Sequence, residues 1–271
     1  MTGKKGVILK RLTVGKILLI FLIIYIGFLV LPYVCHKKVP ASYQESFDVS
    51  SFYGSGPGPE RTAYIDNNDD ALLWRLRLIE EAREEIILST FDFKSDEAGK
   101  DIIAALMQAS DRGVQVRVIV DGFNGVLKLT GNKYFKALVS CPGVSIKIYN
   151  PISPFGPWDM QARLHDKYLI IDNSMYMLGG RNTMELFEQN VDRELFVYEK
   201  KQPDENASIS QMRRYFETVW ALPDSREYVC RKKTSSVEQA DKELRERYEY
   251  LRETYSEAYS DWDFTALTME T

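Results

Sequence analysis

The segment from Leu164 to Asp172 constrains the fold of this chain most strongly, because it places titratable side chains on both sides of a short apolar run. His165 and Lys167 are two residues apart, so on an extended strand their side chains point to the same face. The run Tyr168–Ile171 is typical of a buried strand, and Asp172 follows it directly. Burying this strand therefore gathers a histidine and a lysine at the end of a sheet.

A glycine pair and an amide follow the next expected strand. This strand covers 175–178 and leads into Gly179 and Gly180, where the backbone can turn tightly or approach a ligand closely. Asn182 offers both a hydrogen-bond donor and an acceptor beside the turn. An imidazole, an ammonium group and an amide together suit a phosphate ester, because the imidazole attacks phosphorus while the other two groups hold the non-bridging oxygens.

The spacing of these residues resembles the motif of the phospholipase D superfamily. That motif is His-x-Lys, four residues, Asp, six residues, Gly-Gly or Gly-Ser, one residue, and Asn. Its fixed positions correspond here to His165, Lys167, Asp172, Gly179, Gly180 and Asn182. The Gly-Gly-Arg-Asn form is most similar to the cardiolipin synthase branch. The alternative is a core strand with an incidental histidine and lysine, but ionisable pairs are rarely buried without partners.

The resemblance implies a phosphohistidine mechanism that needs no metal and no other cofactor. His165 is expected to attack phosphorus or to protonate the leaving alkoxide, depending on which copy of the motif attacks. Lys167 and Asn182 are expected to bind the phosphate oxygens of the substrate. Gly179 and Gly180 are placed beside the same phosphate by the need for an unhindered backbone.

Acidic residues complete the expected site. Asp172 is expected to fix strand geometry or to pair with a nearby cation. A catalytic histidine usually needs a carboxylate on its second ring nitrogen to set the tautomer. Glu194 matches the acidic position of the family best, and Asp192 on the same strand face is the second candidate, although either can also be a solvated charge at a strand end. The expected catalytic set is His165, Lys167, Asp172 and Glu194.

The chain carries one copy of the motif, whereas the chemistry requires two proton-handling groups on opposite sides of phosphorus. The other histidine is His36, but Tyr43 occupies the position where the motif needs aspartate, so we expect His36 at the membrane interface. A two-fold homodimer can bring two copies of His165 together. A second chain with the same motif can also complete the site, or the chain is a truncated half without activity. The long tail resembles the approach to a missing second half.

Charge separates the N-terminal segment from the body of the chain. Seven of the 35 Lys and Arg residues lie in 1–38, where there is no Asp or Glu, so the body has 28 basic and 39 acidic residues and a net charge of −11. Such a body is a poor nucleic-acid binder, because that affinity comes mainly from neutralising phosphates. The resemblance implies a phosphatidyltransferase or phosphodiesterase, and the acidic body favours glycerophospholipids as its substrates. A dimeric nuclease with a local basic groove is the alternative.

An uncharged run over 17–34 predicts one transmembrane helix. Five basic residues precede this run and two follow it closely, which predicts a cytoplasmic N-terminus and a body outside the cytoplasm. A cleavable signal peptide is the competing interpretation. Cys35, Cys141 and Cys230 show no metal-ligand spacing, and free thiols are expected over a disulfide between the last two.

The rest of the chain predicts an α/β/α sandwich with a mixed central sheet, as in phospholipase D-like proteins. Expected helices cover 71–82, 96–111, 132–140 and 208–221, and expected strands cover 85–93, 113–121, 144–149, 168–171, 175–178 and 194–198. The expected regions are a basic N-terminus and anchor over 1–38, a linker over 39–64, a catalytic half-domain over 65–225 and an amphipathic helical tail over 226–271.

Two further segments leave alternatives open. The loop Pro151–Trp158 has aromatic residues that either line an acyl or glycerol pocket or pack inward as part of a structured crossover. From Val237 to Trp262, apolar residues recur at steps of mostly three or four, which predicts one long amphipathic helix. This helix is expected to pack on its own domain, with a partner protein as the alternative. The residues from Asp261 onward resemble a linker.

Overall fold

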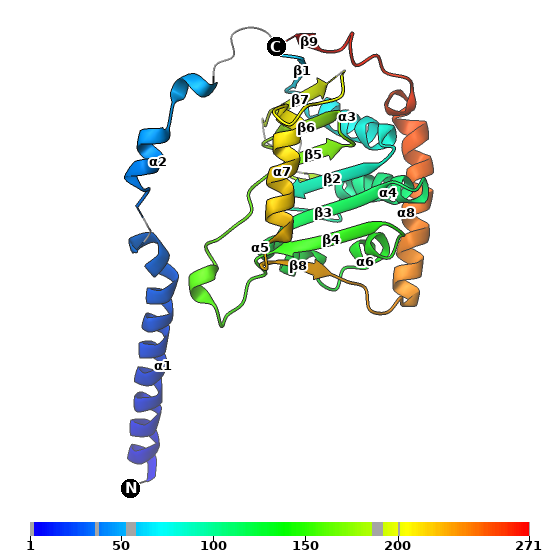
Figure 1. Ribbon diagram of the computed structural model, residues 1–271. Coiled ribbons are helices and arrows are strands. Elements are labelled where there is room, and N and C mark those ends of the chain that lie inside the picture. The colour runs from blue at the N-terminus through cyan, green and yellow to red at the C-terminus, as the bar shows by residue number, and fades with distance from the viewer. Residues whose placement is uncertain (1–2, 36–37, 53–57, 186–191, 200, 271) are drawn as a thin grey trace. The chain divides into compact units, whose positions relative to one another are not determined.

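A mixed β-sheet lies at the centre of the larger of two units into which the chain divides (Figure 1). The computed structural model describes residues 3–35, 38–52, 58–185, 192–199 and 201–270. One unit comprises Met1–Tyr53 with Ile152–Ala162, and the other comprises Gly54–Pro151 with Arg163–Thr271. His36, which we expect at a membrane interface, lies outside the described residues.

Within the described residues the sheet has nine strands in the order β8-β4-β3-β2-β5-β6-β7-β1-β9. The strands are β1 (Glu60–Ile65), β2 (Glu85–Thr90), β3 (Gln115–Asp121), β4 (Val144–Tyr149), β5 (Tyr168–Ile171), β6 (Met175–Gly179), β7 (Glu194–Glu199), β8 (Ser225–Tyr228) and β9 (Met269–Glu270). β2, β3 and β4 run parallel, and the other neighbouring pairs are antiparallel. The expected mixed central sheet is confirmed.

Helices cover both faces of this sheet (Figure 1). The helices are α3 (Asn68–Glu81), α4 (Glu97–Asp111), α6 (Lys133–Val139), α7 (Ser208–Ala221) and α8 (Ser235–Thr254), with short turns α5 (Gly122–Asn124), η2 (Gly125–Leu129) and η5 (Ser256–Tyr259). Side chains alternate along β2, so Ile86 and Leu88 join the core under α3, α4, α6 and α8. Ile87 faces the other way and packs in the cluster that includes Phe216 of α7.

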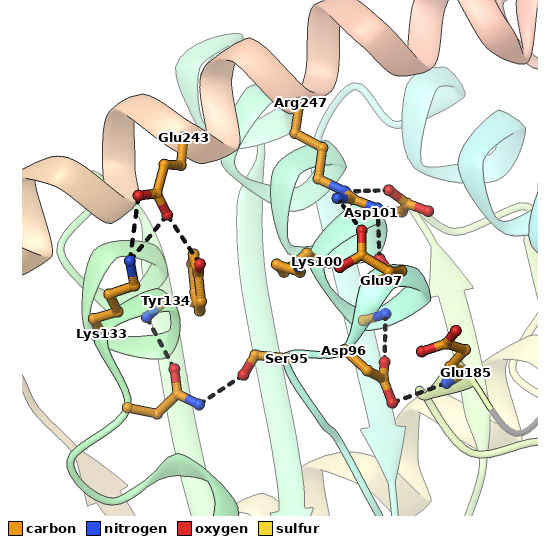
Figure 2. A network of polar contacts seen from close by, with 12 residues as sticks. Ser95, Asp96, Glu97, Lys100, Asp101, Lys133, Tyr134, Glu185, Glu243 and Arg247 are labelled. Carbon is orange, nitrogen blue, oxygen red and sulfur yellow. Dashed lines mark hydrogen bonds and ion pairs between the residues drawn. The ribbon is translucent and has the colours of Figure 1, made fainter.

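The tail helix α8 packs on its own domain, as its amphipathic pattern predicts. Its buried stripe includes Leu244, Tyr248 and Leu251. Polar contacts flank this stripe: Arg247 bonds Asp101 and, at 2.7 Å, Glu97 on α4, while Lys133 at the start of α6 donates to Glu243 at 3.0 Å (Figure 2). The C-terminal helix is therefore part of the helical layer on this face of the sheet.

The residues after α8 are neither a continued helix nor a linker, so both predictions are wrong. The helix ends at Thr254. Tyr255 leaves the helical conformation at φ −111° and ψ 44°, and the 3₁₀ turn η5 follows. Phe264 then enters the core, and β9 pairs with β1, where Arg61 donates to the carbonyl oxygen of Thr268 at 2.6 Å.

The expected linker over 39–64 also contains regular structure. Helix α2 covers Ala41–Ser46, a 3₁₀ turn η1 covers Val49–Phe52, and β1 begins at Glu60 and pairs with β7. β1 was not predicted, because the sequence Glu-Arg-Thr-Ala-Tyr-Ile has no long apolar run; its hydrogen-bonding partner lies far along the chain. The strand β2 ends at Thr90 instead of 93, and β8 was not predicted.

The smaller unit contains helix α1 (Gly3–Val34), the elements α2 and η1, and a loop with the 3₁₀ turn η3 (Pro157–Asp159). The part Val14–Val34 has a mean hydropathy of 2.8 over its most apolar window and is long and apolar enough to cross a membrane. All three cysteines are free thiols, as expected over a disulfide.

Candidate active site

Strand polarity explains why the polar motif residues meet at one edge of the sheet. Strand β5 runs antiparallel to β2 and to β6, so Tyr168 at its start pairs with Ser89 near the end of β2 and with Leu178 near the end of β6. Strand β7 begins at Glu194, which pairs with Gly179. The segments that leave β2 and β6 and those that enter β5 and β7 therefore meet at the same ends of these central strands. We call this end of the sheet, where β5 begins, the β5 edge.

His165 stands exposed at the β5 edge between an aromatic ring and a lysine. Its imidazole lies 4.8 Å from the ring centroid of Phe91, which follows β2. The Nζ atom of Lys167 is 3.3 Å from each imidazole nitrogen of His165 and donates to the His165 carbonyl oxygen at 2.9 Å. The same Nζ lies 5.5 Å from the Phe91 ring centroid, a cation–π distance. Phe91 thus packs beside both motif residues.

The lysine of this pair has a perturbed proton affinity. Burial lowers the pKa of Lys167 from its ordinary value, while the carboxylates of Asp166 and Asp192 act in the opposite direction. Asp166 accepts a hydrogen bond from the Tyr215 hydroxyl at 2.7 Å, which fixes one of these charges. Lys167 is therefore a partly desolvated cation beside an exposed imidazole, which is an electrostatic setting that attracts an anionic phosphate.

Asn182 is oriented by the backbone that follows β2. Its Oδ1 atom accepts from the N–H of Asp92 at 3.1 Å. Thr183 reinforces this contact, because its N–H donates to the Asp92 carbonyl at 3.0 Å and its carbonyl accepts from Lys94 N–H at 3.1 Å. The Nδ2 amide group makes no hydrogen bond with any described residue, so it remains a donor for a ligand oxygen.

The two glycines pack closely against the segment that leads into β7, but with different neighbours. A Cβ atom on Gly179 would lie 2.2 Å from the Arg193 carbonyl oxygen, which belongs to rigid backbone. A Cβ atom on Gly180 would meet the Asp192 carboxylate at 2.6 Å, which is the movable end of a side chain. Only Gly179 is therefore excluded from substitution by main-chain atoms.

Glu194 is at the β5 edge but is bonded to arginines. Its buried carboxylate bonds the guanidinium of Arg75 from α3, and a second guanidinium, that of Arg181, lies 3.8 Å away. Burial raises the pKa of Glu194 while both arginines act against that shift, and burial lowers the pKa of Arg75. No hydrogen bond joins Glu194 to His165 among the described residues, so the expected histidine–carboxylate contact is not part of this arrangement.

Asp172 lies at the opposite end of β5 and is not brought together with His165. The two are seven positions apart along mostly extended chain, a length on the order of 20 Å. The Asp172 carboxylate accepts from the N–H groups of Arg83, Glu84 and Glu85, with distances between 2.8 and 3.3 Å. Its backbone is in the left-handed region at φ 51°. This environment is that of a structural residue at a strand end.

Asp121 is a positioning residue that lies outside the motif. Its buried carboxylate, at the end of β3, accepts from the N–H of Leu164 at 2.9 Å and lies 3.5 Å from the Arg163 guanidinium. Arg163 also donates to the Asn150 carbonyl at 2.7 Å. These contacts hold the backbone directly before His165. The predicted strand over 113–121 ended in this aspartate, which was the available sequence signal.

Comparison with known proteins gives a family match over the central part of the chain. A family model described as cardiolipin synthase, PLD-like domain, matches residues 76–220. Cardiolipin synthase 1 of Bacillus cereus is 31% identical over 140 residues, covering 50% of this chain and 26% of that protein. Cardiolipin synthase B of Escherichia coli (strain K12) is 36% identical over 120 residues, covering 44% of this chain and 28% of that protein. The matches span less than a third of these curated relatives.

Solved structures give more distant likenesses. NucT from Helicobacter pylori has a TM-score of 0.49 at 19% identity and covers 62% of this chain and 99% of that chain. Phosphatidylserine synthase from Haemophilus influenzae Rd KW20 has a TM-score of 0.47 at 14% identity and covers 71% of this chain and 44% of that chain.

Proposed function

This chain belongs to the family described as cardiolipin synthase, PLD-like domain, and we propose that it is a membrane-anchored enzyme that transfers or hydrolyses the phosphatidyl group of glycerophospholipids. The observation that carries this proposal is the meeting of His165, Lys167 and Asn182 at the β5 edge. The net charge of −11 on residues 39–271 favours a lipid substrate over a nucleic acid.

His165 is the proposed nucleophile. One imidazole nitrogen attacks phosphorus, so an N–P bond forms and the bond from phosphorus to the leaving alkoxide breaks. The Lys167 ammonium and the Asn182 Nδ2 amide stabilise the charge that develops on the non-bridging oxygens. Water or a lipid alcohol then attacks the phosphohistidine, and the N–P bond breaks. Water gives a phosphatidic acid, and an alcohol gives a new phosphodiester.

A second proton-handling group has to act on the leaving and entering oxygens. It donates a proton to the leaving alkoxide and takes one from the water or alcohol that enters. We propose that a second copy of His165 supplies this group in a two-fold homodimer, because an isologous interface duplicates every residue of the site. A separate chain that carries the same motif is the alternative partner.

The N-terminal helix α1 is the proposed anchor. Its stretch Val14–Val34 is long enough to span the hydrocarbon core of a bilayer. The basic residues that precede this stretch favour a single pass with the N-terminus in the cytoplasm and the body outside.

Turnover of phosphatidylglycerol tests the activity. The detergent-solubilised full chain is incubated with this lipid, and the products are resolved by mass spectrometry. Wild type is expected to release glycerol and to form either cardiolipin, by transfer, or phosphatidic acid, by hydrolysis. His165→Ala is expected to form none of these products. Glu249→Gln, on the exposed face of the tail helix α8, is the matched control and should keep wild-type activity. Equal turnover by wild type and His165→Ala would refute the proposed nucleophile.

A subunit-mixing experiment tests the shared site. Wild type and His165→Ala are unfolded together, refolded at varied ratios and assayed at constant total protein. If both copies of His165 serve one site, activity follows the square of the wild-type fraction, so an equal mixture keeps about a quarter of it. A linear decrease to about half would exclude a site that needs both histidines. Activity that appears only after a second motif-bearing chain is added would support the hetero-complex instead.

A further inference from the structure

The loop that precedes the His165 strand packs on the N-terminal helix. Residues 152–162 form one unit with α1, although they are far from it in the sequence. The Trp158 ring contacts the Phe28 ring edge-on, with centroids 5.9 Å apart. The Tyr25 hydroxyl donates to the Met160 sulfur at 3.6 Å. The loop therefore lies along the apolar helix.

A glutamine side chain adds polar contacts between the same loop and helix. The Gln161 Oε1 atom accepts from the Tyr33 hydroxyl at 2.8 Å. Its Nε2 atom donates to the Leu29 carbonyl oxygen at 3.4 Å. An amide in a membrane needs such partners, because water is not available there to satisfy it.

These contacts fall on the C-terminal half of the apolar stretch Val14–Val34. With a rise of about 1.5 Å per residue, Phe28 lies about 9 Å before Val34 along the helix axis, and Tyr25 lies about 13 Å before it. The hydrocarbon core of a bilayer is about 30 Å thick. If α1 spans the membrane, the loop therefore lies beside it within one leaflet.

The backbone of the loop is suited to that environment. Irregular backbone is costly in lipid, because unpaired N–H groups cannot be hydrated. Five N–H groups of residues 152–162 are bonded to acceptors within the loop, those of Phe155, Gly156, Asp159, Met160 and Ala162. Two further residues, Pro154 and Pro157, have no N–H group. Most of the donor groups that would oppose insertion are thus paired or missing.

The side chains of the loop also favour contact with lipid. Phe155 is 90% exposed and Trp158 is 48% exposed, so these aromatic side chains do not both pack inward as a structured crossover requires. Asp159 is the single charged residue in 152–162. An exposed phenylalanine and a half-exposed tryptophan beside an apolar helix are typical of a membrane interface.

We propose that residues 152–162 insert beside α1 into the leaflet on its C-terminal side and contact the acyl chains and glycerol backbones of phospholipids. This inference rests on the membrane anchor of the proposed function and adds a second lipid contact. His165 follows Ala162 by three residues, a chain length of about 10 Å.

Fluorescence quenching by brominated lipids tests the insertion. The full chain is reconstituted in phosphatidylcholine vesicles with or without bromine on the acyl chains, and the loss of tryptophan emission is compared with that of Trp158→Phe. Wild type is expected to lose more emission than the variant. Trp220→Phe is the matched control, because that residue packs on Phe216 of α7, and it should leave the quenched emission unchanged. Phe155→Trp in the Trp158→Phe background should restore quenching.

Two outcomes would overturn the inference. One is equal quenching of wild type and Trp158→Phe by brominated lipid. The other is quenching of the Trp158 emission by aqueous acrylamide but not by bromine. The quenching does not require turnover, so His165→Ala should behave as wild type does. An active enzyme without Trp158 quenching would refute the loop insertion alone, and quenching without turnover would refute the proposed activity alone.

Discussion

Asp172 belongs to the sequence motif but lies far from the other motif residues, so its replacement should weaken the fold and leave the chemistry intact. In Asp172→Ala three backbone N–H groups lose a charged acceptor. Hydrogen bonds to charged groups contribute about 1.5–3 kcal/mol each when buried. Only the Glu85 N–H is partly buried, while those of Arg83 and Glu84 are exposed and regain water. We expect a hydrogen-bonding loss of about 3 kcal/mol.

The backbone conformation adds to this cost. Asp172 has φ 51°, where alanine is strained by about 1 kcal/mol and asparagine is tolerated. The total for Asp172→Ala is therefore about 4 kcal/mol. Asp172→Asn keeps a side-chain oxygen acceptor and loses the charge, so it should cost about 1 kcal/mol.

Urea unfolding of the detergent-solubilised chain, followed by tryptophan emission, measures both variants. The unfolding midpoint of Asp172→Ala should fall well below that of Asp172→Asn, and both should keep wild-type turnover per folded molecule. Equal destabilisation by the two substitutions would refute the assignment of the cost to backbone strain and lost acceptors. A loss of turnover at an unchanged midpoint would refute the structural role altogether.

Three further predictions concern the β5 edge and the tail helix. Gly179→Ala should destabilise the fold by about 2 kcal/mol, because its Cβ would meet main-chain atoms, whereas Gly180→Ala meets a movable carboxylate and should cost less in the same urea titration. Arg75→Met should cost about 3–5 kcal/mol by leaving buried Glu194 without its nearest cation, and a second change, Glu194→Leu, should restore most of the midpoint. The hydrogen bond from Lys133 lowers the pKa of Glu243 below its ordinary 4.5. The ionised Glu243 therefore stabilises the fold above pH 4.5, and this contribution is lost as the pH falls through the lowered pKa. Glu243→Gln should weaken the acid dependence of the melting temperature.

The sequence predicted the elements whose signal is local. The helix over 208–221 and the strands over 144–149 and 168–171 have the bounds expected from the local sequence pattern. β1 and β9 were missed, because a short strand at the side of a sheet depends on partners elsewhere in the chain. Likewise, α8 ends where the chain turns back toward the sheet. The periodic apolar pattern of the helix carries no information about that point.

In the candidate site too, residue spacing predicted the local arrangement, whereas contacts between distant segments were not predicted. The spacing predicted that His165 and Lys167 would lie together, because two residues on a strand share a face. The motif did not reveal Phe91, whose ring packs beside both, because Phe91 lies outside the motif, directly after β2. The partner of Glu194 could not be predicted either, because Arg75 lies on a helix more than a hundred residues earlier in the chain.

The motif residues therefore have two different roles, one at each end of β5. At one end of β5, Asp172 caps the N–H groups that begin β2; at the other, the pairing of Ser89 with Tyr168 brings Phe91 beside His165. A slip of one residue between β2 and β5 would turn every side chain of β5 to the other face. The pairing of β5 on both sides opposes that slip, because a shifted β5 would have to break its ladders with β2 and with β6 together. Loss of the Asp172 cap should therefore lower stability without shifting the register on which the His165 site depends.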